Sequence, residues 1–389
     1  MRCFERQMKA VIIEAFDNYS YPVRLKYVEE SMKSHGMEVV VLSSDFDHRN
    51  KCEYNVTRKD LELIHVPRYK KNLSLFRMIS HSVFAHKVYK ILLTLQPEII
   101  YCSAPPNSLV KWASLYKKQH HKVRLITEFG DLWPETLPLH HWKKSIFKPM
   151  FALWKRIRDD YLSYSDLLIY ECEFFREKLS IVNKECEEKV IYYCKKDELI
   201  ETKDFIGLLN DGILRMAYIG SINNIIDIDI IVNILIRIGN NRKVIFEIIG
   251  DGEKRESLLE ACRRYGIKYN YHGIVYEETK KATILCNCHF GLNIMKKSVA
   301  VGATMKSMDY LHYGLALVNN IEHDTWNIVN QYNCGFNIDN IENCVDAISN
   351  IDDDHIISLR NNARRAYEEL FSEKSTIKSF DIIFDSICI

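Results

Sequence analysis

The sequence lacks the features that define several classes of protein. No apolar run approaches the roughly 20 residues that a membrane-spanning helix needs, and the first strand-to-helix loop, residues 17–22, has no glycine. The G-x-G-x-x-G fingerprint of dinucleotide enzymes is therefore missing there. Twelve cysteines occur without the spacing of a disulfide framework, and no secretory signal precedes them. These absences argue against membrane-spanning, dinucleotide-dependent and secreted disulfide-rich proteins, and they predict a cytoplasmic one.

Charge is nearly balanced over the chain but unevenly distributed. The net charge of +1 argues against a nucleic-acid-binding protein, and no recognisable nucleic-acid module accompanies the basic residues. Residues 1–205 contain 34 Lys and Arg against 28 Asp and Glu, whereas residues 206–389 contain 19 against 24. A basic front half and an acidic back half indicate different partners for the two.

Two stretches of the basic half contain no acidic residue. Pro67–Pro97 and Leu137–Arg158 each carry six Lys or Arg among apolar residues at helical spacing, with Trp142 and Trp154 in the second. Basic side chains against anionic headgroups, with aromatic rings at the boundary, are typical of a helix on a membrane surface. Core packing with a basic outer face is the alternative for each stretch. Their presence in one half favours a peripheral position on the inner face of the cell membrane.

Strand-like apolar runs alternate with helical periodicity along the chain, which predicts an α/β protein. With 389 residues and 47% hydrophobic content, two domains with their own cores are expected. We place an N-terminal Rossmann-like domain at residues 1–200 and a second one at 201–389, with the last helix able to pack back on the first domain. Whether Met1 or Met8 is the natural start stays open.

The segment Asn293–Asn320 places small residues, lysines and one carboxylate between two strand-like runs. A helix is predicted over residues 306–313, opened by small residues that include Thr304. Its N-terminus would present unpaired N–H groups and a partial positive charge, with Lys306 one turn inside. Asp309 follows on the same helical face, where it could accept hydrogen bonds from a ribose diol. The segment predicts a pocket for a diphosphate, and an ordinary helix with a solvated Lys-Asp pair is the alternative.

A second candidate site follows the predicted strand Arg124–Thr127. The loop Glu128–Glu135 crowds three carboxylates and Trp133 around a glycine and a proline. A rigid acidic loop beside an indole ring suits a hydroxyl-rich sugar. A purely structural loop in which Asp131 caps a helix is the alternative.

We predict no metal site. Cys286, Cys288 and His289 lie in an apolar, strand-like run, and buried cysteine commonly serves as a small core residue. Core packing is therefore the favoured interpretation of this cluster over a metal centre.

Five motifs, in order along nearly the whole chain, resemble GT-B glycosyltransferases of the family 4 type, which assemble bacterial surface polysaccharides. The motifs are Asp131–Glu135, Tyr218–Ser221, Ile249–Gly252, His272–Gly273 and Lys306–Gly314. The first is similar to the DLWPE loop of a subgroup that acts on lipid-linked acceptors. The last is similar to the family's P-S-K-x-x-E-Y-x-x-x-G segment.

The resemblance implies two Rossmann-like domains facing across a cleft, the GT-B architecture. It also implies transfer of a sugar from a nucleotide-sugar donor to a lipid-linked or saccharide acceptor, with retention of configuration and without an obligatory metal or other cofactor. The pathway would be capsule, exopolysaccharide or O-antigen biosynthesis. The implied catalytic residues are Lys306, Asp131 and Glu135. The implied donor-binding residues are Gly220, Ser221, Gly273, Val275, Thr304, Ser307 and Asp309, and the local positive charge, rather than the resemblance, adds Lys296 and Lys297.

Departures from the family pattern leave the donor open. Asp309 stands where the family usually has Glu, and Asn223 and Asn224 stand where an Arg/Lys pair often follows the Gly220 turn. Lys296 and Lys297 would replace the missing positive charge. A UDP-sugar is the favoured donor. The alternatives are a sugar-nucleotide 2-epimerase of the same fold and a non-catalytic subunit of an assembly complex.

Overall fold

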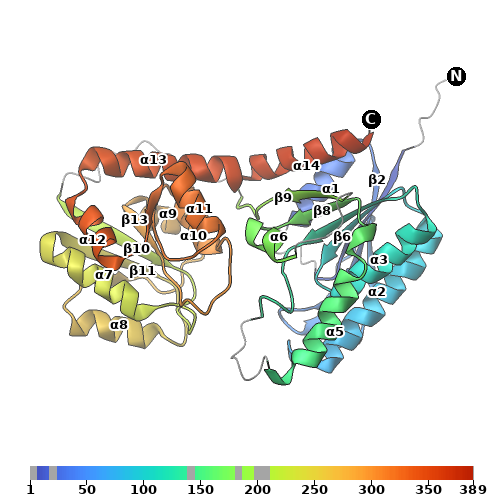
Figure 1. The fold of residues 1–389 in the computed structure, drawn as a ribbon, viewed down its shortest axis with the longest axis horizontal. Helices are drawn as coiled ribbons and strands as arrows, with labels where there is room; N and C mark the ends of the chain where they lie inside the picture. Colours follow the sequence, from blue (N-terminus) through green and yellow to red (C-terminus); the bar gives the residue numbers. More distant parts are fainter. Residues whose placement is uncertain (1–6, 17–23, 138–144, 180–185, 197–210, 389) are drawn as a thin grey trace. The chain divides into compact units, whose positions relative to one another are not determined.

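The computed structural model describes residues 7–16, 24–137, 145–179, 186–196 and 211–388. The chain divides into two compact units, each built around its own sheet (Figure 1). Unit 1 comprises residues 1–193 and 376–389, and unit 2 comprises residues 194–375. The chain therefore passes between the units twice, and the C-terminal segment groups with the first unit.

Unit 1 contains a seven-stranded sheet in which all neighbouring strands are parallel. In sheet order the strands are β5 (Leu61–Ile64), β2 (Glu38–Ser44), β1 (Lys9–Glu14), β6 (Ile99–Ala104), β7 (Arg124–Phe129), β8 (Leu167–Tyr170) and β9 (Glu187–Val190). A short hairpin, β3 (Phe46–Asp47) and β4 (Cys52–Glu53), lies outside this sheet. Its helical elements are α1 (Arg24–Ser34), α2 (Leu75–Leu95), α3 (Asn107–Gln119), α5 (Lys148–Asp159), the 3-10 turn η1 (Leu162–Tyr164), α6 (Glu173–Leu179) and most of α14 (Glu373–Cys388).

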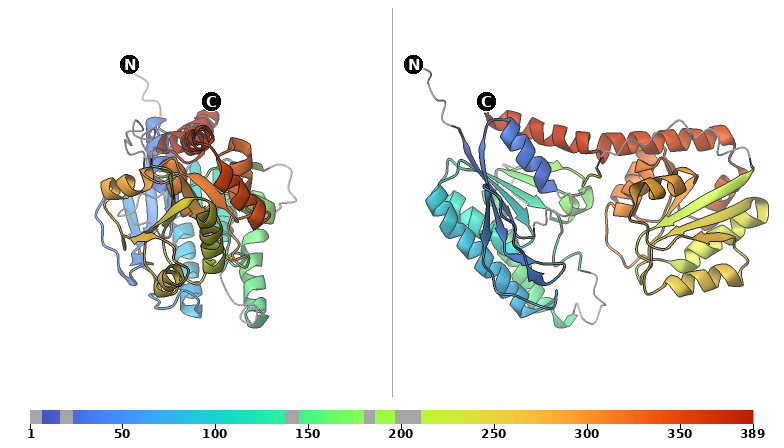
Figure 2. Two further views of the ribbon diagram at one scale, coloured as in Figure 1. Left: turned by 90° about the vertical axis from the view of Figure 1, so that its left-hand side faces the viewer. Right: turned by 180° about the vertical axis from the view of Figure 1, so that it is seen from behind.

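Helices cover both faces of this sheet. The helices α2, α3 and α5 pack side by side on one face, and α1 lies against β1 and β2 (Figure 1). Figure 2 shows α14 beside α1, where Ser31 donates a 2.5 Å hydrogen bond to Asp381 and His35 lies 3.1 Å from Asp385. These bonds attach the C-terminal helix to unit 1.

Unit 2 contains a six-stranded sheet, also parallel throughout. In sheet order its strands are β12 (Tyr269–Tyr271), β11 (Lys243–Ile249), β10 (Ile213–Ile219), β13 (Phe290–Asn293), β14 (Ala316–Asn319) and β15 (Gly335–Asn337). Its helices are α7 (Ile228–Asn241), α8 (Arg255–Arg264), α9 (Glu278–Cys286), α10 (Met305–His312), α11 (Asp324–Tyr332), α12 (Ile341–Asn350) and α13 (Asp353–Leu370).

The sheet arrangement explains why the strands appear as continuous apolar runs in the sequence. Helices on both faces bury both sides of a parallel strand. Residues 10–13 of β1 and 316–318 of β14 are accordingly fully buried. The predicted α/β class is confirmed. No described helix is long and apolar enough to cross a membrane.

Candidate functional site

The N-terminus of α10 is fixed by a reciprocal pair of hydrogen bonds. The Thr304 hydroxyl accepts from the backbone N–H of Ser307 at 3.0 Å, and the Ser307 hydroxyl accepts from the N–H of Thr304 at 3.2 Å. This capping box satisfies two N–H groups that a helix start would otherwise leave unpaired. Both side chains are buried. They therefore hold the start of the predicted helix in place from within.

The same helix start is tied to the edge of the sheet. Asn293, Asn319 and Asn337 lie in register at the carboxyl ends of β13, β14 and β15. Their side chains form a chain of amide hydrogen bonds of 3.0 and 2.8 Å, and the Thr304 hydroxyl donates to Asn293 Oδ1 at 3.0 Å. Because buried polar groups that are fully paired are rigid, α10 begins at a defined point beside the strand ends.

Lys306 lies in the first turn of α10, with its side chain against the end of β10. A Cβ atom added at Gly220 would lie 3.3 Å from Lys306 Cε, so a larger residue there would press on this side chain. The ammonium donates to the Tyr218 hydroxyl at 2.9 Å and lies 4.5 Å from the ring centroid. The hydroxyl in turn donates to the backbone carbonyl of Ser221 at 2.8 Å. Lys306, Gly220 and Ser221, which were predicted separately, are thus brought together.

Burial lowers the pKa of Lys306 to about 8. Among the described residues no carboxylate lies within 4 Å of this ammonium, so no negative charge offsets the loss of water around it. A desolvated cation next to a helix N-terminus favours a negatively charged ligand. The arrangement can hold a phosphate group and stabilise charge that develops on it.

The turn that contains the predicted donor-binding residues Gly273 and Val275 lies at the same edge of the sheet. The Gly250 N–H donates to the Gly273 carbonyl at 2.7 Å, and Gly250 itself packs directly on the Gly220 carbonyl. After Gly273 the side chain of Val275 is buried, whereas Tyr276 is 86% exposed. The ends of β10, β11 and β12 therefore form one continuous edge that includes Gly220, Gly273 and Val275.

Asp309 has a partner that sequence reasoning missed. Its Oδ1 pairs with the ammonium of Lys195, which also lies 3.2 Å from Glu278 Oε1 and 5.1 Å from the Tyr313 ring centroid. Burial alone would lower the pKa of Lys195, but the two carboxylates outweigh it and raise the pKa. Burial would raise the pKa of Glu278, but Lys281, Tyr313 and Lys195 hold it at about 2. The carboxylate expected at the ribose is thus part of a paired cluster.

Replacing Lys195 with Met should destabilise unit 2 by about 2 kcal/mol or more, because it leaves the largely buried Asp309 carboxylate without its cation. Lys281→Met is the matched control, since Lys281 pairs with Glu278 at 2.6 Å and leaves the Lys195–Asp309 pair intact. The free energy of unfolding from denaturant titrations measures both. Adding Asp309→Asn to Lys195→Met should recover part of the loss. Strictly additive losses would mean that the two residues do not interact.

Lys296 and Lys297 are not brought to Lys306 by any described contact. The side chain of Lys296 lines a separate hollow of about 370 Å³ with residues of α7 and α8 such as Asp229 and Glu260. Lys297 is exposed. The described structure therefore concentrates positive charge on Lys306 alone at the start of α10, and the two lysines stay predicted phosphate contacts.

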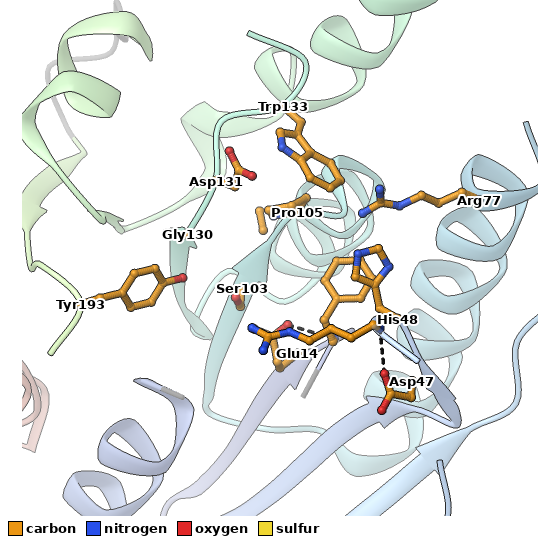
Figure 3. Close-up of a pocket in the computed structure, with 13 residues that line it drawn as sticks. Glu14, Asp47, His48, Arg77, Ser103, Pro105, Gly130, Asp131, Trp133 and Tyr193 are labelled. Atoms are coloured by element: carbon orange, nitrogen blue, oxygen red, sulfur yellow. Dashed lines mark hydrogen bonds between the residues drawn. The ribbon is translucent and has the colours of Figure 1, made fainter. Parts of the chain in front are cut away.

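Unit 1 contains a cavity of about 300 Å³ at the carboxyl ends of β1, β6 and β7. Figure 3 shows the side chains that line it, with Asp131 and Trp133 from the loop after β7 and Arg77 reaching in from α2. Asp131 Oδ1 accepts from the Leu132 N–H at 2.8 Å and from the Thr136 hydroxyl at 2.6 Å. Burial nevertheless raises the pKa of Asp131, which makes it a better proton acceptor than an exposed aspartate.

The three carboxylates of the loop are dispersed rather than grouped. Glu128 forms a buried ion pair with Arg24 at 2.8 Å. Glu135 forms two hydrogen bonds with Arg158, of 2.7 and 3.1 Å, and burial, which would raise its pKa, is outweighed by Arg158, which lowers it. Only Asp131 of the three lines the cavity. Glu135 thus anchors the loop to α5, and a residue with a lowered pKa is a weak proton acceptor.

One basic residue of α2 does not lie on the outer face of the helix. Arg77 is 2% exposed, whereas Leu75 and Phe76 are 68% and 69% exposed. In the first turn of α2 the arginine therefore lines the cavity and the apolar pair is exposed. In α5, Trp154 packs edge-on against Trp133 and is likewise buried. Trp142 lies outside the described residues.

Cys288 and His289 pack in the core as predicted, whereas Cys286 is half-buried and ends helix α9 rather than lying in a strand. Cys288 and His289 are at most 1% exposed, and the Arg215 N–H donates to His289 Nδ1 at 2.9 Å. Burial lowers the pKa of His289 to about 3. No group of three metal-ligating side chains is found among the described residues.

Two α/β units, each built on a parallel sheet with candidate site residues at the carboxyl ends of its strands, are the architecture of the GT-B fold. Solved structures share this fold over nearly the whole chain. Sucrose-phosphate synthase (tll1590) from Thermosynechococcus elongatus matches with a TM-score of 0.67 and 12% identity, over 98% of this chain and 99% of that one. The apo form of the lipopolysaccharide outer core galactosyltransferase WaaB matches with a TM-score of 0.65 and 12% identity, over 98% and 100%. Anabaena Alr3699/HepE in complex with UDP-glucose matches with a TM-score of 0.59 and 12% identity, over 98% and 100%.

At 12% identity these matches establish the fold alone. No protein-family model and no curated protein matches the sequence.

Proposed function

We propose that this protein is a retaining glycosyltransferase that moves a sugar from a nucleotide-sugar donor, with UDP-sugars favoured, to a saccharide acceptor. The observation that carries the proposal is the buried ammonium of Lys306 at the N-terminus of α10, held between Gly220 and Tyr218. A cation that is already desolvated and positioned stabilises a leaving diphosphate without further reorganisation. The similar fold of HepE, which is described in complex with UDP-glucose, supports the choice of donor.

In this proposal the other residues take roles set by their surroundings. Asp309 holds the ribose with its charge balanced by Lys195, and the turn Gly273–Val275 holds the base. Asp131 positions or deprotonates the acceptor hydroxyl in the unit 1 cavity. Glu135 acts indirectly, by fixing the Asp131 loop through Arg158. Lys296 and Lys297 add long-range attraction for the donor phosphates.

A screen of UDP-, GDP- and dTDP-sugars for binding and hydrolysis by the purified protein tests this function. Binding of at least one donor, with slow hydrolysis to the nucleoside diphosphate, is expected. Product analysis with donor alone separates the alternatives, because a 2-epimerase would also return the epimeric sugar. A protein that binds and hydrolyses none of the donors would be a non-catalytic member of the fold.

We propose further that the acceptor is lipid-linked and that unit 1 docks on an anionic membrane surface, as expected for capsule, exopolysaccharide or O-antigen biosynthesis. The support is the exposed cluster Leu75, Phe76 and Ile79 at the start of α2, directly after the exposed Lys70 and Lys71. Apolar side chains next to basic ones suit the boundary between headgroups and acyl chains. Lys155 and Arg156 contribute less, since they pair with acidic neighbours.

Binding to anionic liposomes should therefore fall with salt yet persist, because the inserted apolar residues are insensitive to screening. Phe76→Ser should reduce co-sedimentation several-fold, whereas Ile382→Ser, at an exposed apolar position of α14, should not. Transfer to a short water-soluble acceptor should survive both changes. Equal, negligible binding to anionic and neutral vesicles would remove the membrane from the proposal.

A further inference from the structure

Arg77 differs from the other buried arginines of unit 1. Arg24 pairs with Glu128 and Arg158 pairs with Glu135. Arg77 is 2% exposed and has no carboxylate partner within 4 Å among the described residues. Its guanidinium donates from Nε to His81 Nε2 at 3.3 Å and from Nη1 to the Asn72 carbonyl at 3.0 Å, and both acceptors are neutral. No carboxylate therefore forms a direct ion pair with Arg77, and Asp131, which lines the same cavity, offsets its charge only in part.

The Arg77 side chain lines the unit 1 cavity. Nη2 makes no hydrogen bond of normal geometry, although buried arginine nitrogens are normally paired, and the side chains that compensate the guanidinium are Tyr69 and, less directly, Asp131. Burial lowers the pKa of Arg77 to about 10, and Tyr69 and Asp131 offset this lowering only in part. The group lies 4.1 Å from the centroid of the Trp133 ring, which holds its plane and orients it toward the cavity (Figure 3). Such an unsatisfied, oriented cation is costly unless it binds something negative.

The other polar groups of the cavity define how a ligand would lie. Glu14 and Asp131 lie on the strand ends and the loop after β7, and Glu14 accepts from the Phe16 N–H at 3.0 Å. Their carboxylates can accept hydrogen bonds from sugar hydroxyls but repel an anion. An acidic sugar would therefore place its negative group at Arg77, its ring against Trp133 and its hydroxyls toward the carboxylates.

We propose that the unit 1 cavity recognises an acceptor sugar that carries an anionic group, a carboxylate or a phosphate ester, and that Arg77 binds this group. The role of this sugar as the acceptor rests on the proposed function. The inference narrows the acceptor from any saccharide to an acidic one. Arg77 is then the specificity residue of the cavity, with Trp133 as the surface on which the sugar lies.

Titration calorimetry with glucuronic acid, glucose 6-phosphate and glucose tests the proposal on the full chain. UDP is added at saturation so that phosphate cannot occupy the site beside Lys306. At least one acidic sugar should bind about tenfold or more tightly than glucose, as expected for a charge-assisted hydrogen bond. Preference for glucuronic acid identifies a carboxylate, and preference for glucose 6-phosphate identifies a phosphate. Equal binding of all three, or no binding of either acidic sugar at about 10 mM, overturns the proposal.

Variants assign the preference to Arg77. Arg77→Met should abolish the preference for the acidic sugar, Arg77→Lys should keep part of it, and Arg156→Met, at an exposed arginine of α5, should leave it unchanged. If Arg77→Met does not fold, the preference for the acidic sugar over glucose is compared between Arg77→Lys and the wild-type protein, and a reduced preference in Arg77→Lys still supports the assignment. A preference that survives Arg77→Met overturns the assignment. UDP binding is measured separately, so failure of the donor site and failure of this site give different results.

Discussion

Replacing Lys306 with alanine should lower the rate of sugar transfer at least about a hundredfold, because the ammonium is the cation positioned for the leaving diphosphate. Its ammonium donates a hydrogen bond of 2.9 Å to the Tyr218 hydroxyl, and its aliphatic chain lies over Gly220, which has no side chain. Removing it creates no unpaired carboxylate, so the fold should persist. Lys280→Ala, at an exposed lysine of α9, is the control and should retain full activity.

The same lysine gives the reaction a pH signature. Burial lowers the pKa of Lys306 to about 8, so the free protein loses this charge as the pH rises through that value. A bound diphosphate favours the charged form, and donor affinity should therefore fall by up to about tenfold per pH unit above 8. The Lys306→Ala variant should lack this dependence. A variant that keeps more than about a tenth of the wild-type rate, a barrier change under about 1.4 kcal/mol, would show that the phosphate site lies elsewhere.

Local sequence patterns were sufficient for the fold and for the start of α10. Parallel strands buried on both faces are apolar throughout, which is why their alternation with helical segments predicted an α/β protein. The strand predicted at Arg124–Thr127 continues to Phe129 in β7, since its pairing with β6 extends to that residue. An apolar run shows burial but does not show where strand pairing stops.

Local patterns could not show which charges would meet. Lys195 and Asp309 are far apart in the sequence, and no periodicity connects a residue just after β9 with one on α10. Arg77 was grouped with the basic residues of its helix because helical spacing cannot show that the first turn lies over a cavity. The exposed Leu75 and Phe76 beside it are a signal that the pattern of inward apolar residues fails there. The roles of Lys195 and Arg77 could therefore be recognised only from the tertiary structure.

Replacing Gly250 with alanine should destabilise unit 2 by about 3–5 kcal/mol, from backbone strain and from steric overlap. Gly250 has a φ angle of +134°, which side-chain-bearing residues rarely adopt. A Cβ atom there would lie 1.9 Å from the carbonyl oxygen of Gly220, a backbone atom that cannot rotate away. Relief of the overlap would displace the Gly220 turn, so donor binding beside Lys306 should weaken together with stability.

Two other glycines of unit 2 separate the contributions. Gly266 has a φ of +66° with nothing within 4 Å of an added Cβ, so Gly266→Ala should cost only about 1 kcal/mol of conformational strain. Gly239 lies in α7 at an ordinary φ with equally open space, and Gly239→Ala should be neutral or stabilise by up to about 1 kcal/mol. Denaturant unfolding of the three variants gives the comparison. A loss of stability at Gly250 no larger than that at Gly266 would contradict the close approach between the ends of β10 and β11. It would also contradict the position of the Gly220 turn over which Lys306 lies.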